Sequence, residues 1–270
     1  MVDQARDRYT HGHEDAVLRS HRWRTASNSA AYLLPHLQPG DRLLDVGCGP
    51  GTLTVDLARA VSPGEVVGID LAASVIAEAS AHAYDAGFNN VSFLTGDFRY
   101  VGLEPRTFDV VHAHQVLQHL RDPVGATETM GRLVREGGLV AVRDSDYGAF
   151  TWCPANSGLE KWRETYSRVA RRNGAEPKAG RLLLAWAHAA KWPEPTYSTS
   201  TWTFATASDK SWWSHLWAER CTTSAFARQA IEYRIATNEE LELLADEWRS
   251  WAKDPDALFI VLHGEVLARF

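Results

Sequence analysis

The stretch Leu43-Leu44-Asp45-Val46-Gly47-Cys48-Gly49-Pro50-Gly51-Thr52 decides the fold of this chain of 270 residues. The apolar residues before Gly47 are typical of a buried strand, and a helical pattern begins at Thr52. The glycines between them allow a tight turn and let the backbone approach a ligand without a Cβ in the way. The stretch therefore predicts a strand, a ligand-binding turn and a helix in direct succession.

Outward from this turn, short apolar runs alternate with helical patterns over the first half of the chain. Strands are predicted at residues 42–46, 65–71, 91–96, 108–113 and 139–143, and helices at 52–60, 73–86 and 123–135. Continuous apolar strands that alternate with helices indicate a parallel sheet covered on both faces. We therefore predict an α/β fold with a doubly wound sheet.

Two acidic residues at strand ends add to the signal of the turn. Asp70 ends the second predicted strand, 19 residues after Gly51, where an acid accepts both hydrogens of a ribose diol. Asp97 follows the third strand and precedes Phe98, which suits an adenine amino group and ring face. A dinucleotide oxidoreductase is disfavoured, because its fingerprint G-x-G-x-x-G requires glycine where Thr52 stands.

Together these motifs resemble those of class I S-adenosylmethionine-dependent methyltransferases, within them the ubiquinone/menaquinone-biosynthesis-like small-molecule branch. The matching segments are residues 43–51, 67–71, 95–98, 108–111 and 119–123, and the resemblance covers roughly residues 20–147. It implies S-adenosylmethionine as cofactor and methyl transfer as the activity. It also implies a seven-stranded Rossmann-like sheet, mostly parallel, with an antiparallel last strand.

Carried over residue by residue, the resemblance assigns roles around the cofactor. The glycines of the turn would pass close to the methionine moiety, Asp70 would hold the ribose, and Asp97 would bind the adenine amino group. His114 and Gln115 would lie beside the sulfonium. The full set of predicted cofactor-binding residues is Arg24, Asp45, Gly47, Gly49, Gly51, Asp70, Leu71, Asp97, Phe98, His114 and Gln115.

The segment Gln115-Val116-Leu117-Gln118-His119 bears on the mechanism. A related group of quinone O-methyltransferases carries E-V-L-E-H here, where the acids can hold a divalent cation. Neutral amides are poor ligands for a hard cation, so we predict metal-independent transfer and no metal ligands. His119 is the candidate base, since an unperturbed histidine has a pKa of about 6.5. The alternative is a histidine bonded to backbone at a helix start.

The N-terminal residues 1–40 are first polar and rich in His and Arg, and then follow an amphipathic helical pattern from Ser20 to Leu37. In the related branch such a segment lies over the cofactor, so residues 1 to about 20 are predicted to form a lid. Arg24 or Arg22 is the candidate partner of the methionine carboxylate.

Several side chains of this segment carry competing interpretations. Tyr9 and His13 are predicted to face the substrate and are, with His119, the catalytic candidates. A solvated segment is the second possibility. A metal site of His11, His13 and His21 is the third, and these histidines lack Cys or acid partners at a recognised spacing.

The C-terminal part changes pattern. A capping box is predicted at Ser157 and another at Thr237, and the sixth and seventh strands are placed near 196–204 and 258–268. The segment 205–257 between them is far too long for a hairpin loop. Its aromatic residues are Trp212, Trp213, Trp217, Phe226, Tyr233, Trp248 and Trp251. They form a helical core, wall a substrate pocket, or cover a dimer surface.

These patterns predict three parts: an N-terminal lid and helix (1–40), a cofactor-binding α/β core (41–150), and a sheet end with a helical substrate-covering elaboration (151–270). The acceptor is predicted to be a small apolar or aromatic molecule. The alternative is a protein that binds S-adenosylmethionine without methyl transfer, using it structurally or for a reaction such as cyclisation.

Composition narrows the partners. The formal charge of −6 argues against nucleic acid, including tRNA, because phosphate binding needs a basic footprint. No apolar run approaches the about 20 residues of a membrane span, and the first residues lack the apolar region of a secretory signal. With three cysteines in a chain of this length, we expect a cytoplasmic protein, monomeric or homodimeric.

Overall fold

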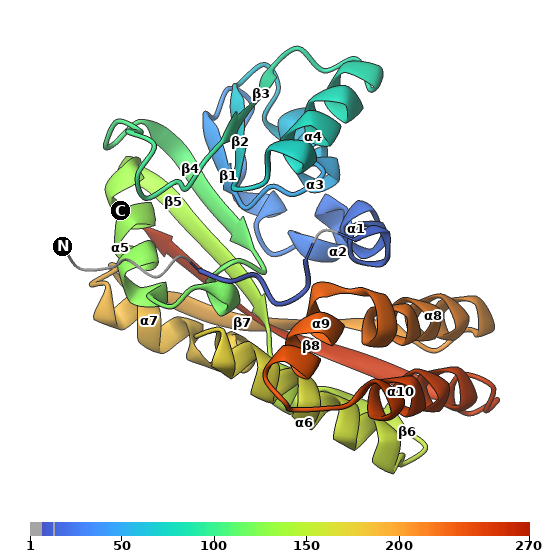
Figure 1. Cartoon of the computed structure of the whole chain (residues 1–270). Coiled ribbons are helices and arrows are strands. Elements are labelled where there is room, and N and C mark those ends of the chain that lie inside the picture. Colours follow the sequence, from blue (N-terminus) through green and yellow to red (C-terminus); the bar gives the residue numbers. More distant parts are fainter. Residues whose placement is uncertain (1–6, 13) are drawn as a thin grey trace.

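The computed structural model describes residues 7–12 and 14–270, and its centre is one β-sheet (Figure 1). The strands are β1 (Leu43–Val46), β2 (Val66–Asp70), β3 (Val91–Thr95), β4 (Phe108–His114), β5 (Val134–Ser145), β6 (Thr151–Cys153), β7 (Thr196–Phe204) and β8 (Leu258–Arg269). Their order across the sheet is β3-β2-β1-β4-β5-β8, and both β6 and β7 pair with β8. β1 to β5 are parallel, and β8 runs antiparallel to β5, β6 and β7.

This sheet confirms the predicted doubly wound α/β fold and its antiparallel last strand. It differs from the prediction in number, because the described residues form eight strands rather than seven. The additional strand is β6, whose three residues pair with the beginning of β8. A run of three residues is too short for a strand period to show in the sequence.

Helices cover both faces of the sheet. They are α1 (Asp15–Arg22), α2 (Ala26–Ser29), α3 (Thr52–Val61), α4 (Ala73–Asp85), α5 (Pro123–Leu133), α6 (Ser157–Arg172), α7 (Leu183–Ala189), α8 (Ala207–Thr223), α9 (Ala225–Glu232) and α10 (Asn238–Trp251). Leu43 of β1 belongs to the apolar cluster with Leu57 of α3, and Leu44 belongs to the cluster with Met130 of α5. Neighbouring residues of one strand thus pack on opposite faces, which explains the continuous apolar strands of the sequence.

The sequence predicts one amphipathic helix in the N-terminal segment, but the structure has two short helices there. The chain forms α1, turns at Trp23, and begins α2 after Thr25, whose side chain caps Asn28 in a reciprocal capping box. The predicted apolar stripe is therefore divided. Trp23 packs against the C-terminal aromatic cluster, whereas Ala30 packs with α3 under the sheet. Thr25 is extended because it caps α2, so the helical conformation is interrupted there although the apolar spacing continues.

The predicted helix starts of the C-terminal half have mixed outcomes. α10 begins with the predicted capping box of Thr237 and Glu240. α6 is capped instead by Asn156, whose side chain accepts the N–H of Leu159, so the capping box assigned to Ser157 is wrong. Asn and Ser are equally good caps, and the sequence alone does not separate two adjacent ones.

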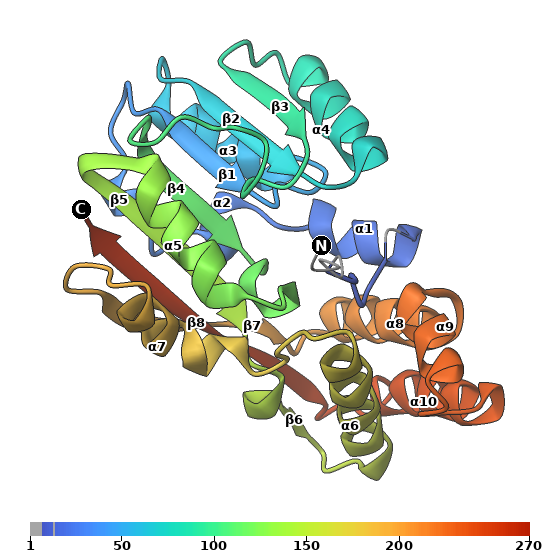
Figure 2. The ribbon, with the colours of Figure 1, turned by 60° about the vertical axis from the view of Figure 1, so that its left-hand side comes forward.

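Helices α6, α8, α9 and α10 gather at the end of the sheet where β8 begins (Figure 2). Trp162, Trp217 and Trp248 are buried at the centre of this helical cluster, with Phe259 of β8. α1 packs against α8, so the N-terminal segment lies between the helical cluster and the sheet (Figure 1). Within residues 7–12 and 14–270, every helix is too short or too polar to cross a membrane.

Candidate functional site

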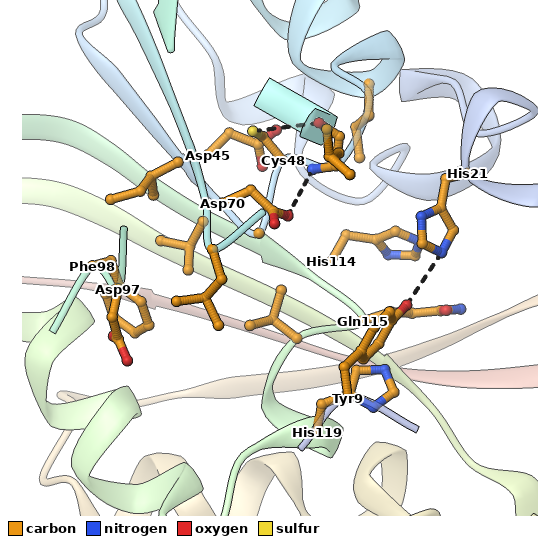
Figure 3. A pocket seen from close by; sticks show the side chains of 18 of the residues that line it. Tyr9, His21, Asp45, Cys48, Asp70, Asp97, Phe98, His114, Gln115 and His119 are labelled. Carbon is orange, nitrogen blue, oxygen red and sulfur yellow. Dashed lines mark hydrogen bonds between the residues drawn. The ribbon is translucent and has the colours of Figure 1, made fainter. Parts of the chain in front are cut away.

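A cleft opens at the carboxyl ends of β1, β2 and β4, and Figure 3 shows side chains that line it. The strand order reverses at β1 and β4, the place where open α/β sheets bind ligands. The predicted site residues that line the cleft are Tyr9, Arg24, Asp45, Gly47, Gly49, Asp70, Leu71, Asp97, Phe98, His114, Gln115 and His119. Gly51 does not line it, and His13 lies outside the described residues.

The glycine turn joins β1 to α3 in a backbone conformation that suits glycine. Gly47 has a φ of +67°, and a Cβ there would lie 2.4 Å from a methyl carbon of Val116. Gly51 has a φ of +81°, and a Cβ there would lie 2.8 Å from the Cβ of Ala79 in α4. Gly47 therefore shapes the cleft, whereas Gly51 lets α3 pack against α4.

Asp45 and Asp70 have different tasks. Asp45 is buried under the turn, where its carboxylate accepts from the Thr54 hydroxyl at 2.6 Å and lies 2.8 Å from Nδ1 of His112. Asp70 faces the cleft, and its oxygens each accept one backbone N–H, from Gly49 at 3.2 Å and from Ala72 at 3.0 Å. Asp45 ties β1 to α3 and β4, whereas the backbone contacts of Asp70 leave it lone pairs for a ligand in the cleft.

Asp97 lies in an ion-pair chain that sequence reasoning missed. Nη2 of Arg99 lies 2.6 Å from Asp97 and 2.6 Å from Asp7 of the N-terminal segment. Burial opposes the charged form of Asp97, but hydrogen bonds and charge from Arg99 outweigh it and lower the pKa of the carboxyl. In the sequence, only the position of Arg99 directly after Phe98 of the third motif could have pointed to it as a site residue. Nothing in the sequence pointed to Asp7.

Arg24 and Gln115 meet at the junction of β4 with its following loop. Gln115 adopts a left-handed conformation, with a φ of +56°. Its Oε1 accepts from Nη2 of Arg24 at 2.9 Å, and its Nε2 lies 2.8 Å from Nε2 of His263. A left-handed non-glycine residue at a cleft marks a position fixed by its surroundings. Arg22, the alternative to Arg24, points away and pairs with Glu78 and Asp15.

His119 and Tyr9 close one side of the cleft, with ring centroids 4.7 Å apart in an edge-to-face arrangement. Burial, aided by the charge of Arg24, lowers the pKa of His119 to about 3. Burial likewise raises the pKa of Tyr9 to about 12. Both side chains are therefore neutral at pH 7, and His119 is a weak proton acceptor in this arrangement. Its role as a base stays a prediction.

Residues 7–12 form a segment, here called the roof, that crosses from the cleft to α9. Asp7 accepts the backbone N–H of Arg121 at 2.8 Å, beside its ion pair with Arg99. Thr10 accepts from Asn173 at 2.9 Å, and the buried His11 bonds the Tyr166 hydroxyl at 2.8 Å. The roof thus ties the loops that follow β3 and β4 to the C-terminal helices.

A second, smaller cavity adjoins the cleft, and we call it the aromatic pocket. It shares His21, Arg24 and Gln115 with the cleft. Its aromatic walls are Tyr147, Phe150, Trp202, Trp213 and Trp217. All four tryptophans Trp213, Trp217, Trp248 and Trp251 belong to the buried helical core, and Trp213 and Trp217 also line the pocket.

The second amide considered for metal binding, Gln118, is buried away from the cleft, where its Oε1 accepts from the Ser145 hydroxyl at 2.9 Å. In the part of the chain that the structure describes, His, Cys, Asp and Glu form no group of three that could hold a metal ion. His11, one of the three histidines considered as metal ligands, bonds tyrosine hydroxyls instead.

Comparisons of this chain with known proteins bear on what the cleft binds. A family model described as a methyltransferase domain matches residues 37–215. An uncharacterized methyltransferase of Schizosaccharomyces pombe is 31% identical over 268 residues, which are 96% of this chain and 95% of that protein. The chain belongs to the class I S-adenosylmethionine-dependent methyltransferases. The predicted family, enzyme class and cofactor are thereby confirmed.

Two further proteins that this methyltransferase resembles are also named as methyltransferases. A probable methyltransferase of Aspergillus luteorubrus is 28% identical over 277 residues, with 96% of each chain covered. The solved geranyl diphosphate methyltransferase in complex with GPP and sinefungin superposes with a TM-score of 0.53 at 17% identity, covering 89% of this chain and 76% of the other. That likeness is one of fold.

Proposed function

We propose that this methyltransferase transfers the methyl group to a small, flat apolar or aromatic acceptor, without a metal ion. The observation that carries the proposal is the aromatic pocket beside the cleft, which shares His21, Arg24 and Gln115 with it. A cofactor in the cleft and an acceptor in the pocket meet at these side chains. The aromatic side chains in its wall suit a flat ring, and the polar side chains between them suit an acceptor that carries a polar substituent.

The residues of the cleft fit the cofactor at both polar ends. Asp70 binds the ribose hydroxyls with the lone pairs that its two backbone contacts leave free. Nε of Arg24 is buried without a hydrogen-bond partner among the described residues, which supports its binding of the methionine carboxylate. Asp97, with Phe98 beside it, accepts the adenine amino group.

Bound S-adenosylmethionine supplies a methyl group already activated by positive sulfur. The chain therefore has to orient the acceptor and exclude water. Tyr9 of the roof and His119 cover the cleft with neutral rings, and Gln115 holds Arg24 in position. No proton transfer by His119 is needed for an acceptor that reaches the pocket as an anion.

Two observations support metal independence and a small acceptor. Gln115 and Gln118 replace carboxylates, and both use their amide groups in internal hydrogen bonds. The net charge of −6 gives little attraction for a polynucleotide. The cytoplasmic location, the monomeric or homodimeric state and the three-part division of the chain stay predictions.

Titration calorimetry with S-adenosylhomocysteine, followed by a transfer assay with methyl-labelled cofactor, tests the proposal. The assay panel holds one- to three-ring aromatic acceptors and bulk tRNA. We expect submicromolar to micromolar product binding and label in at least one aromatic compound. Label in tRNA alone contradicts the small acceptor. Product binding without label in any acceptor would instead support a protein that binds the cofactor without transfer.

A further inference from the structure

Arg220 of α8 is a buried cation in the wall of the aromatic pocket, with 4% of its surface exposed. Its Nε and Nη2 donate to backbone carbonyls of α1, to Ala16 at 3.2 to 3.4 Å and to Val17 at 3.5 Å. Nη2 also donates to the hydroxyl of Ser20. All of these acceptors are neutral, and within the described residues no carboxylate lies in ion-pair distance of Arg220.

Arg143 is a second buried arginine, and it has a carboxylate partner. It is 1% exposed, and its Nε lies 3.1 Å from the carboxylate of Glu265. A buried ion without a counter-charge is costly, and chains normally place an opposite charge beside it. Arg143 follows this rule and Arg220 does not, which leaves Arg220 able to bind an anionic group of a ligand.

The position of Arg220 separates two sources of negative charge. Arg24 lines both the cleft and the pocket, and we have assigned it to the methionine carboxylate of the cofactor. Arg220 lines only the pocket. Its guanidinium lies 4.9 Å from the centroid of the Trp217 ring, so one face is covered by an aromatic wall. A flat anion in the pocket would meet the edge of the guanidinium beside that wall.

We propose that Arg220 binds the carboxylate of a planar aromatic acid, and that such acids are the acceptors of this methyltransferase. This rests on the proposed function, because it narrows the acceptor class. Among the described residues, Nε and Nη2 donate to α1, so Nη1 is the atom left to donate to the carboxylate. Trp202 and Trp213 line the same pocket, where the ring of a small acid would contact their edges.

The competing explanation is that Arg220 only fastens α1 to α8 through its bonds to Ala16, Val17 and Ser20. A fastening role predicts loss of stability without any preference for charge in the ligand. An anion-binding role predicts a preference for the carboxylate over its neutral amide. The experiment therefore has to compare ligands that differ in charge and hardly in shape.

Benzoate, 2-naphthoate and anthracene-2-carboxylate, each beside its primary carboxamide, are titrated into enzyme saturated with S-adenosylhomocysteine, and binding is followed by tryptophan fluorescence. We expect at least one acid to bind tenfold or more tightly than its amide. In Arg220→Met this ratio should fall to about one, and Arg220→Lys should keep part of it. The matched control is Arg163→Met, since Arg163 also covers a tryptophan ring, at 5.0 Å, but pairs with Glu160.

The outcomes are separable. Equal binding of every acid and amide by the wild type, or no binding of either, overturns the assignment even if Arg220→Met does not fold. A ratio that survives in folded Arg220→Met, with S-adenosylhomocysteine affinity unchanged, overturns it as well and leaves a fastening role. Failure of the wild type to bind S-adenosylhomocysteine would instead be a failure of the proposed function.

Discussion

The cleft and the aromatic pocket are adjacent, but they are assembled from the chain in different ways. The strand-end residues of the cleft, such as Asp45, Asp70 and His114, come from consecutive strand-helix units. The pocket combines His11 and Ser20 from the N-terminal segment with Trp217 from α8 and Val261 from β8. The cleft is a product of local sequence, whereas the pocket exists only when distant segments pack together. Changes in the two regions should therefore have different effects.

The largest effect is expected from Asp70→Ala in the cleft. Two hydrogen bonds to a charged acceptor are lost, each worth about 1.5–3 kcal/mol, so affinity for S-adenosylhomocysteine should fall by about a hundredfold or more. Titration calorimetry measures it. Asp41→Ala is the matched control, since Asp41 also accepts a loop N–H, from Gln38 at 2.8 Å, but lies outside the cleft. Equal affinities of the two variants would remove Asp70 from the cofactor site.

A smaller effect is expected from deleting residues 1–12, which removes the roof and with it Asp7 and Tyr9 of the cleft and His11 of the pocket, but leaves the rest of both cavities. Ala16 and Val17 are fully buried, so the deletion has to stop before α1. We expect kcat/KM to fall about tenfold or more, because water reaches the methyl group and the acceptor is held less firmly. The melting temperature should also fall by several degrees, because the buried Thr10 and His11 bond Asn173 and Tyr166, so kcat/KM is compared at a temperature at which the variant is folded.

Hydrogen exchange sharpens this test of the roof. A roof that opens for product release belongs to the least stable part of the fold. Amides of residues 7–12 should exchange quickly in the free enzyme and slowly with S-adenosylhomocysteine bound, while those of β4 are protected in both. Equal exchange in the two states would leave the segment without a role as a lid.

Lowering the pH should reduce the free energy of unfolding, because histidines buried where the cleft and the pocket meet are protonated only in the unfolded chain. Burial lowers the pKa of His119 to about 3, and it also lowers the pKa values of His11, His114 and His263. Stability is full above the unfolded pKa of about 6.5 and is lost as the pH falls toward the folded values, because only the unfolded chain takes up these protons. Each histidine removes about 1.4 kcal/mol between pH 7.5 and 5.5.

Urea unfolding at pH 7.5 and 5.5 measures this loss. His119→Gln should reduce the difference between the two pH values by about 1.4 kcal/mol. His188→Gln, which changes an exposed histidine of α7, should leave the difference as it is in the wild type. A pH difference that His119→Gln does not alter would show that His119 becomes charged in the folded protein.

The smallest effect is expected from removing metal ions. Neither region relies on carboxylates gathered around a cation, so turnover with a confirmed acceptor should be unchanged in excess EDTA. The assay is repeated with added magnesium. A loss of turnover that magnesium restores would contradict the argument from Gln115 and Gln118.

The sequence predicted the cofactor half closely because its signals are local. The turn at Gly47 and the acid at Asp70 each follow a buried strand, and parallel strands bring their carboxyl ends to one edge of the sheet. It erred at Thr25, where a local cap outweighed an apolar period, and at Asn156, which caps α6 in place of the adjacent Ser157. It gave Gly51 a place at the ligand, whereas the structure uses it for packing of α3 on α4.

By itself, then, the sequence determined the sheet, the cofactor and the enzyme class, since each depends on residues near one another in the chain. Only the tertiary structure decided which tryptophans line a pocket, that Asp7 joins Arg99 to Asp97, and that Arg220 is buried without an acid. Asp7 and Arg99 are 92 positions apart, and Arg220 and its partners in α1 are 200 to 204 positions apart. Patterns of apolar and charged residues do not predict such contacts, because the packing of the whole chain decides which segments meet.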